Sequence, residues 1–106
     1  MILSIREINE KDIDLCCELD SSTISLWSKK QWNNEFKKKG IKVFGLVFAN
    51  LLVGICVFHV VLDEAQINYF AVRQKYRKRG FGSYMMNHLI MHYPKSVGVL
   101  CDKYGS

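Results

Sequence analysis

Several signals that define common protein classes are missing from this sequence of 106 residues. The longest apolar run, residues 51–62, contains His59 and is shorter than the about 20 residues that a membrane-spanning helix needs. The chain does not open with a basic segment followed by an apolar stretch, so no secretory signal is predicted. We therefore expect a cytoplasmic protein that does not bind membranes.

The patterns of cysteine and histidine that mark metal sites are also absent. The four cysteines are Cys16, Cys17, Cys56 and Cys101. They show no C-x-x-C spacing, and Cys56 lies in the most apolar segment, which favours buried, reduced thiols. His88 and His92 have the i, i+4 spacing of zinc ligands, but no glutamate lies between them and no third ligand is evident. No metal site is predicted.

No internal repeat, low-complexity tract or linker rich in proline and glycine divides the chain. Its length predicts one domain, residues 1–106, with a modest hydrophobic core. A content of 49% hydrophobic and 24% charged residues is typical of globular proteins. The net charge of +5 indicates anionic partners such as phosphates, a cofactor or RNA, without distinguishing among them.

Hydrophobic periodicity predicts the element order β-α-α-β-β-β-α-β, a mixed α/β (α+β) fold. The expected strands are residues 3–8, 42–48, 51–61, 66–72 and 97–101, and the expected helices are residues 10–20, 28–40 and 82–93. Asn9 is the expected N-cap of the first helix, and Ser28 with Gln31 forms a capping box for the second. The long strand over residues 51–61 is apolar on both faces, so it should be central and covered on both sides.

The most informative segment joins the fourth strand to the third helix. An apolar strand ends at Val72, and the helix begins at Gly82 after a basic loop. The consecutive cations of this loop are Arg77, Lys78 and Arg79. Backbone N–H groups converge at a helix N-terminus, the helix dipole adds positive charge, and Gly80 lets a phosphate approach the backbone closely. The segment therefore predicts a pyrophosphate site.

Other readings of this segment fit less well. A Rossmann fingerprint would need a third glycine where Met85 stands, and its glycines would follow directly on a strand. A P-loop is excluded because the sequence has no Gly-Lys-Ser/Thr. The basic loop suits RNA, but there is no RNA-binding motif and the aromatic residues fall at core spacing. Nucleic acid is therefore not the favoured partner.

This segment and the elements around it resemble the GNAT family of N-acetyltransferases. The family's acetyl-CoA motif, Arg/Gln-x-x-Gly-x-Gly/Ala, is matched by residues 77–82, and Phe70-Ala71-Val72 stands at the expected strand end. Within the family the chain is most similar to the RimI-like group, which acetylates the N-terminal amine of a ribosomal protein. That similarity rests on residues 60–65 and on Leu26-Trp27-Ser28, which opens the second helix, and it extends over residues 5–100.

The resemblance implies a GNAT-like, predominantly antiparallel sheet flanked by helices, with acetyl-CoA as co-substrate. A strand that splays from its neighbour leaves backbone groups that the amide-bearing pantetheine arm can satisfy. The residues expected to bind acetyl-CoA are Phe70, Ala71, Val72, Arg77, Lys78, Arg79, Gly80, Phe81, Gly82 and Ser83. The implied function is acetyl transfer to an amine, such as the N-terminus of a ribosomal protein.

The chain departs from the family where catalysis would occur. Cys101 stands about where RimI-like enzymes carry a glutamate as proposed base, and the family's tyrosine-bearing C-terminal helix and strands have no counterpart before Ser106. Gln74 also stands where a proline is common in the family, after the strand that ends at Val72. No catalytic residue is therefore assigned, and we expect weak or absent turnover. The alternative function is an inactive module that binds acetyl-CoA.

Some groups could still serve the chemistry that the resemblance implies. The backbone N–H of Val72 would stabilise the oxyanion of acyl transfer. The remaining acid and base candidates are Glu64, Tyr69, Asp102 and Tyr104. The expected last strand, residues 97–101, would present an uncovered edge, so a homodimer that pairs these edges is also predicted.

Overall fold

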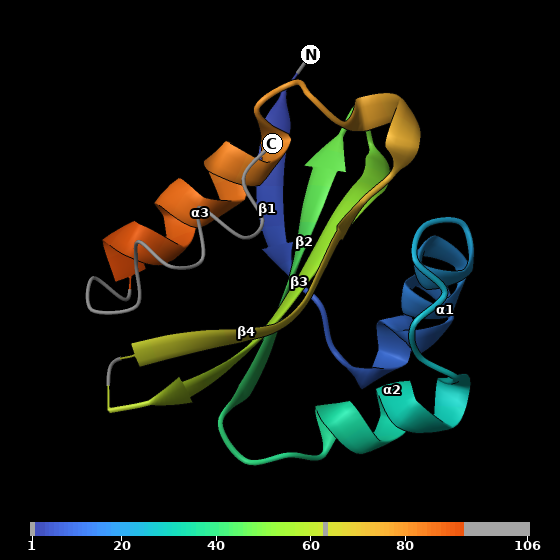
Figure 1. Ribbon diagram of the computed structural model, residues 1–106, viewed down its shortest axis with the longest axis vertical. Helices are drawn as coiled ribbons and strands as arrows, with labels where there is room; N and C mark the ends of the chain where they lie inside the picture. Colours follow the sequence, from blue (N-terminus) through green and yellow to red (C-terminus); the bar gives the residue numbers. More distant parts are fainter. Residues whose placement is uncertain (1, 63, 93–106) are drawn as a thin grey trace.

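The structure is a computed structural model that describes residues 2–62 and 64–92. A four-stranded antiparallel sheet of order β1-β2-β3-β4 lies between helices on its two faces (Figure 1). The strands are β1 (Leu3–Glu7), β2 (Ile41–Phe48), β3 (Leu51–Val61) and β4 (Glu64–Val72), and the helices are α1 (Ile13–Ser21), α2 (Lys29–Phe36) and α3 (Phe81–His92). The predicted order is confirmed through α3, while residues 97–101 lie outside the described part of the chain.

The predicted capping bonds at Asn9 and Ser28 are both present, although Asn9 caps a 3₁₀ turn rather than α1 itself. The Asn9 side chain accepts a hydrogen bond from the Lys11 backbone N–H at 2.9 Å, ahead of the single 3₁₀ turn Glu10–Asp12 that leads into α1. The Ser28 hydroxyl accepts from the Gln31 N–H at 3.2 Å, and the Gln31 side chain accepts from the Ser28 N–H at 2.8 Å. These reciprocal bonds satisfy donors that the first turn of α2 cannot pair within the helix.

Two predicted boundaries are wrong because of strand pairing, in addition to the start of the first helix, whose α-helical part begins at Ile13 rather than at residue 10. Helix α2 ends at Phe36 rather than Gly40, because Gly40 adopts a φ of +82° and its carbonyl accepts the Val60 N–H at 2.9 Å, which draws the chain into β2. Strand β4 begins at Glu64 rather than residue 66, because Glu64 pairs with Val61 across a hairpin turn. At both boundaries, Gly40 and Glu64, hydrogen bonding or pairing with residues of β3 determines where the element ends or begins.

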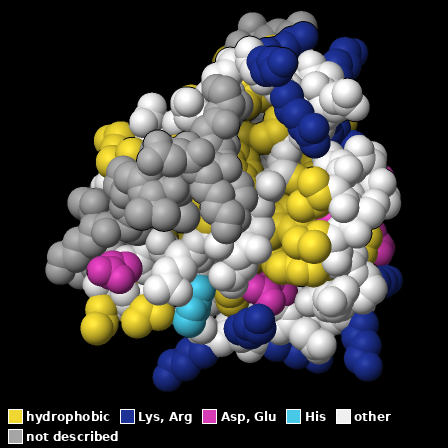
Figure 2. Space-filling view, viewed as in Figure 1, with side chains coloured by type: hydrophobic (Ala, Val, Ile, Leu, Met, Phe, Trp, Pro, Cys, Tyr) yellow, Lys and Arg dark blue, Asp and Glu magenta, His cyan; other side chains and the backbone are white. Residues whose placement is uncertain are grey.

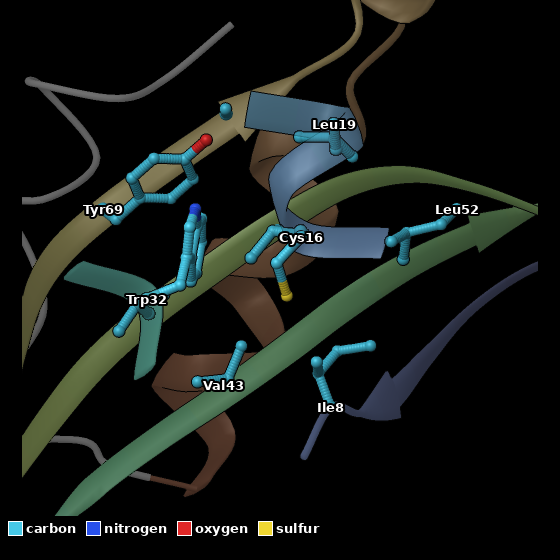
Figure 3. Packing of buried hydrophobic residues seen from close by; sticks show 10 residues of the cluster. Ile8, Cys16, Leu19, Trp32, Val43, Leu52 and Tyr69 are labelled. Atoms are coloured by element: carbon cyan, nitrogen blue, oxygen red, sulfur yellow. The ribbon is translucent and has the colours of Figure 1, made fainter. Parts of the chain in front are cut away.

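Strand β3 lies between β2 and β4 and is covered on both faces, as predicted. One face carries the cluster beneath α1 and α2 (Figure 3), whose members are Ile8, Cys16, Leu19, Trp32, Val43, Leu52, Ile55, Val57, Tyr69 and Ala71. The other face carries the cluster beneath α3, whose members are Leu46, Val53, Cys56, Phe58, Ala65, Phe81, Met85, Met86 and Leu89. The two clusters fix the sheet between its helices.

Strand β4 contains a β-bulge at Asn68. The register steps from the pair Phe58–Ile67 to the pair Val57–Tyr69, so Asn68 has no counterpart on β3. The extra residue shifts the alternation of side chains: Ile67 packs with the cluster beneath α3, whereas Tyr69 belongs to the cluster beneath α1 and α2. The bulge therefore decides which face of the sheet each residue at the end of β4 reaches.

None of the helices in the described part of the chain is both long and apolar enough to span a membrane.

Candidate functional site

The end of β4 directs backbone groups outward from the sheet. The Arg73 N–H donates to the Val53 carbonyl at 2.8 Å, which continues the ladder between β3 and β4 by one residue. Because hydrogen-bonded pairs alternate along an antiparallel ladder, Ala71 directs its backbone groups to β3, while Phe70 and Val72 direct theirs to the outer side of β4. Two of the three residues predicted to bind pantetheine thus present their backbone on that side.

The outer side of β4 already has one occupant in the described structure. The Val72 carbonyl accepts a hydrogen bond from Arg77 Nε at 2.8 Å. This bond brings a cation of the basic loop back onto the strand that precedes it. This contact uses the Val72 carbonyl and does not involve the Val72 N–H, which can donate to another acceptor.

The loop after β4 approaches α3 through two residues with left-handed backbone. Lys78 has a φ of +62° and Gly80 a φ of +79°, on either side of Arg79. The first helical bond runs from the Tyr84 N–H to the Gly80 carbonyl at 2.9 Å. The N–H groups that precede this bond, and so have no partner within the helix, belong to Phe81, Gly82 and Ser83. The unpaired N–H groups at the predicted site therefore belong to three consecutive residues.

The surroundings of Gly80 fit an anionic group. A Cβ atom built at Gly80 would meet no heavy atom within 4 Å, so open space adjoins the backbone at the start of α3. The three cations that precede Gly80, residues 77–79, are exposed, and Figure 2 shows lysine and arginine side chains gathered at the top of the molecule, where Figure 1 places this loop. The dipole of α3, the positive charge of the loop and open access to the backbone thus occur at one place, and this combination favours binding of a pyrophosphate.

An aromatic contact supports the basic loop. The guanidinium of Arg79 lies 5.4 Å from the centroid of the Tyr76 ring, a cation–π distance. Tyr76 in turn stacks on Phe81, the first residue of α3, with ring centroids 6.1 Å apart. The loop is therefore held against the helix that it precedes.

Tyr69, a predicted candidate acid, is engaged in the core. Its hydroxyl donates to Asp20 Oδ1 at 2.8 Å, and Figure 3 shows its ring above Trp32 with the hydroxyl turned toward α1. Asp20 is 2% exposed and also accepts the backbone N–H groups of Leu26 and Trp27 at 3.0 and 3.1 Å. Burial, with the Asp20 carboxylate beside it, raises the pKa of the Tyr69 hydroxyl. This hydroxyl orders the loop between α1 and α2 and is a poor proton donor.

Arg73 ties the end of β4 to α1. Its guanidinium donates to both carboxylate oxygens of Glu18, at 2.5 and 2.9 Å, and to the Ser22 hydroxyl at 3.1 Å. Its Nε donates to the Leu52 carbonyl at 2.9 Å. The bidentate contact lowers the pKa of Glu18. This tie is not predictable from the sequence, because its partners are 55 residues apart and no local motif connects them.

The remaining candidates for acid–base chemistry lie elsewhere. Glu64 is exposed at the first position of β4, eight residues and about 25 Å of extended strand from Val72. Cys101, Asp102 and Tyr104 lie outside the described residues.

Within the described part of the chain, no cluster of three or more histidine, cysteine or acidic residues is arranged to hold a metal ion. The rings of His88 and His92 stack on each other with centroids 4.4 Å apart.

We predict that the buried cysteines resist alkylation in the folded protein. Cys16 and Cys56 are fully buried, and burial raises the pKa of the Cys16 thiol to about 12 and raises that of Cys56 as well. Because the thiolate is the reactive form, iodoacetamide at pH 7.5 should label neither residue until the chain unfolds. Peptide mapping by mass spectrometry, with and without guanidinium chloride, measures this. Native labelling of Cys56 at the unfolded rate would contradict the packing of β3.

The comparison with protein families identifies the chain. A model of the acetyltransferase (GNAT) family matches residues 7–102. The chain belongs to this family, and the resemblance predicted from the sequence is confirmed. No curated protein matches the chain.

Solved structures show the same fold. The ribosomal-protein-S18-alanine N-acetyltransferase from Escherichia coli matches with a TM-score of 0.78 and 23% identity over 89% of this chain. PaiA N-acetyltransferase from Thermoplasma acidophilum, in complex with coenzyme A, matches with a TM-score of 0.69 and 14% identity over 90% of this chain and 74% of its own. NAA60 from Arabidopsis thaliana, in complex with acetyl-CoA, matches with a TM-score of 0.71 and 16% identity over 89% of this chain and 69% of its own. The chain spans 61% of the length of the E. coli structure.

Proposed function

We propose that this chain is an acetyl-CoA-dependent N-acetyltransferase that transfers an acetyl group to an amine, with a protein N-terminus of the ribosomal-protein type as acceptor. The observation that carries the proposal is the left-handed turn at Gly80, with open space beside it, at the start of α3. The family match over residues 7–102 supports the reaction class. The fold shared with an N-acetyltransferase of a ribosomal protein supports the choice of acceptor. We further propose that the chain forms a single domain and is located in the cytoplasm.

The residues of this chain would divide the binding of acetyl-CoA between them. The N–H groups of residues 81–83 and the cations of residues 77–79 would hold the pyrophosphate. The outward backbone of Phe70 and Val72, with Ala71 between them, would hold the pantetheine arm. Bound acetyl-CoA supplies an acetyl group activated as a thioester. The Val72 N–H would donate to the carbonyl oxygen on which negative charge develops.

A second candidate function is a GNAT module that binds acetyl-CoA with little or no turnover. The engagement of Tyr69 favours it, because this hydroxyl is bonded to Asp20 and its pKa is raised. Loss of a positioned acid or base typically slows a reaction about 10²–10⁴-fold.

The predicted homodimer involves residues 97–101, outside the described part of the chain. Light scattering coupled to gel filtration tests it, and a monomer of about 12 kDa would contradict it.

One experiment separates the two functions. Calorimetric titration with acetyl-CoA, and then with coenzyme A, measures binding, and release of the free thiol in the presence of peptides with free N-termini measures turnover. Binding of both ligands with amine-dependent thiol release supports the transferase. Binding without release supports the module, and absence of binding rejects both.

We predict that replacing Glu64 with glutamine leaves the rate of thiol release within about twofold of wild type, which is small beside the usual effect of losing a base. The reason is the position of Glu64, which is exposed at the opposite end of β4 from Val72. The thiol-release assay, run at saturating acetyl-CoA, measures the effect. A loss of about 10²-fold or more would identify Glu64 as the base instead.

A further inference from the structure

A polar cavity of about 450 Å³ lies between α2 and β4. The side chains that line it are Trp27, Gln31, Asn34, Glu35, Lys38 and Asn68. Three of them, Gln31, Asn34 and Glu35, come from α2, and Asn68 is the bulge residue of β4. None of the residues predicted to bind acetyl-CoA lines it. The cavity is therefore distinct from the predicted pyrophosphate site.

Helix α2 turns a polar face toward this cavity. The lining residues Gln31, Asn34 and Glu35 have the spacing i, i+3 and i+4, so they share one face of α2, and Lys38 follows two residues after the helix ends. That spacing normally carries apolar side chains toward a core. In α2 the core contacts are made by Trp32 and Phe36 instead. The helix thus keeps a separate polar stripe for the cavity.

Glu35 is the only acidic residue among the side chains that line this cavity, and it is only 6% exposed. Its Oε2 accepts a hydrogen bond from the Asn68 side-chain amide at 2.8 Å, and its Oε1 pairs with Lys38 Nζ at 2.7 Å. Asn68 is the bulge residue, and its bond to Glu35 places its side chain on the same side of the sheet as that of Tyr69. A carboxylate removed from water in this way requires a compensating positive charge.

The compensating charge is held loosely. The Lys38 side chain is 59% exposed, and it extends from the turn just after α2, three residues beyond Glu35. An exposed lysine on a flexible stem contributes little net stability to such a pair and exchanges readily. The contact also shows that an ammonium group fits against Glu35 within hydrogen-bonding distance.

We propose that this cavity binds a primary ammonium group of the acceptor in exchange for that of Lys38, with Glu35 as the specificity-determining residue. A carboxylate offers about four lone-pair sites, and two are used by Asn68 and Lys38. The indole of Trp27 adds a surface on which a cation binds favourably. Amines of peptides are largely protonated at neutral pH, so the cavity selects their resting form. Asn68 precedes Val72 by four residues, about 13 Å of extended strand, so the cavity holds the ammonium before the amine moves to Val72 for transfer. The inference rests on the proposed function insofar as the ligand is the amine acceptor.

The test measures peptide binding in the absence of acetyl-CoA. Three short peptide amides serve as probes: one whose free α-amine is its only charge, its N-acetylated and uncharged twin, and an N-acetylated version with one lysine. Calorimetry gives affinities, and the NMR shifts of the Asn68 side-chain amide report occupation of the cavity. The two ammonium-bearing peptides should bind more tightly than the neutral one, and the comparison between them separates α-amines from lysine side chains.

Two substitutions should act in opposite directions. Glu35→Gln keeps an acceptor for Asn68 but removes the charge, so ammonium binding should weaken about 10–100-fold. Lys38→Met removes the internal competitor, so binding should strengthen about two- to fivefold. Lys37→Met, at an exposed neighbouring position outside the cavity, is the matched control and should change nothing.

The outcomes separate this inference from the proposed function. A gain of affinity in Lys38→Met cannot arise from misfolding, so it supports the cavity even where Glu35→Gln is unstable. Equal binding of charged and neutral peptides, or no gain in Lys38→Met, overturns the inference and leaves Glu35–Lys38 as a structural pair. Acetyl-CoA titrations of all variants should match wild type. Selective ammonium binding in a chain that does not bind acetyl-CoA would reject the proposed function and keep the cavity.

Discussion

Replacing Gly80 with valine should remove measurable binding of coenzyme A, a loss of at least about 10²-fold, while the chain remains folded. Gly80 has a φ of +79°, which a β-branched residue adopts only with strain on the order of 1–3 kcal/mol. The space beside it is open, so the valine side chain would stand where the anion must approach the backbone. Isothermal titration with coenzyme A measures the loss, and thermal unfolding by circular dichroism reports the fold.

A second substitution separates backbone strain from blocked access. Asparagine tolerates left-handed backbone far better than valine does, so Gly80→Asn should unfold near the wild-type temperature. Its side chain still occupies the open space, so coenzyme A binding should still be lost. Wild-type affinity in Gly80→Asn would show that strain alone explains the valine variant and that the anion binds elsewhere.

Replacing Asp20 with alanine should lower the free energy of unfolding by about 3–5 kcal/mol. Asp20 is buried and accepts the Tyr69 hydroxyl together with the N–H groups of Leu26 and Trp27. Alanine would leave all of these donors without an acceptor, each at a cost of about 1–3 kcal/mol where water cannot reach it. Tyr69→Phe removes a single donor and should cost only about 1 kcal/mol. Urea titrations followed by fluorescence compare the variants.

The same helix offers a matched control for this substitution. Asp14 lies on α1 with a side chain that is 86% exposed, and it pairs with Lys29 at 3.2 Å on the surface. Asp14→Ala should therefore change stability by no more than about 0.5 kcal/mol. A loss in Tyr69→Phe as large as that in Asp20→Ala would mean that the Tyr69 hydroxyl, rather than the loop, is what Asp20 stabilises.

Sequence patterns predicted the features that neighbouring residues determine. The caps at Asn9 and Ser28 were predictable because each bond joins residues two or three positions apart. The turn at Gly80 was predictable because loop, glycines and helix start are contiguous in the sequence. The family resemblance was carried by this same segment and is confirmed.

Features that depend on register or on distant partners were not predictable. The bulge at Asn68 exists only relative to β3, and no local signal distinguishes it from ordinary strand. The bond between Tyr69 and Asp20 spans 49 residues, so the sequence offers Tyr69 as a candidate acid and gives no sign that its hydroxyl is already engaged. The burial of Glu35 depends equally on the approach of β4, since the sequence of α2 alone would place this residue on a solvated face.

The two ties between β4 and α1 have a consequence for how the molecule opens. Tyr69 is bonded to Asp20 just before the segment Phe70–Val72, and Arg73 is bonded to Glu18 just after it. This segment cannot detach from the sheet without disturbing α1, so the two should exchange their amide hydrogens together, as one cooperative unit. Closure around a bound nucleotide is then left to the loop beyond Arg73, where Lys78 and Gly80 already depart from ordinary backbone geometry. Hydrogen exchange in that loop should be fast in the free protein and should slow when coenzyme A is added, while the protection of α1 stays constant.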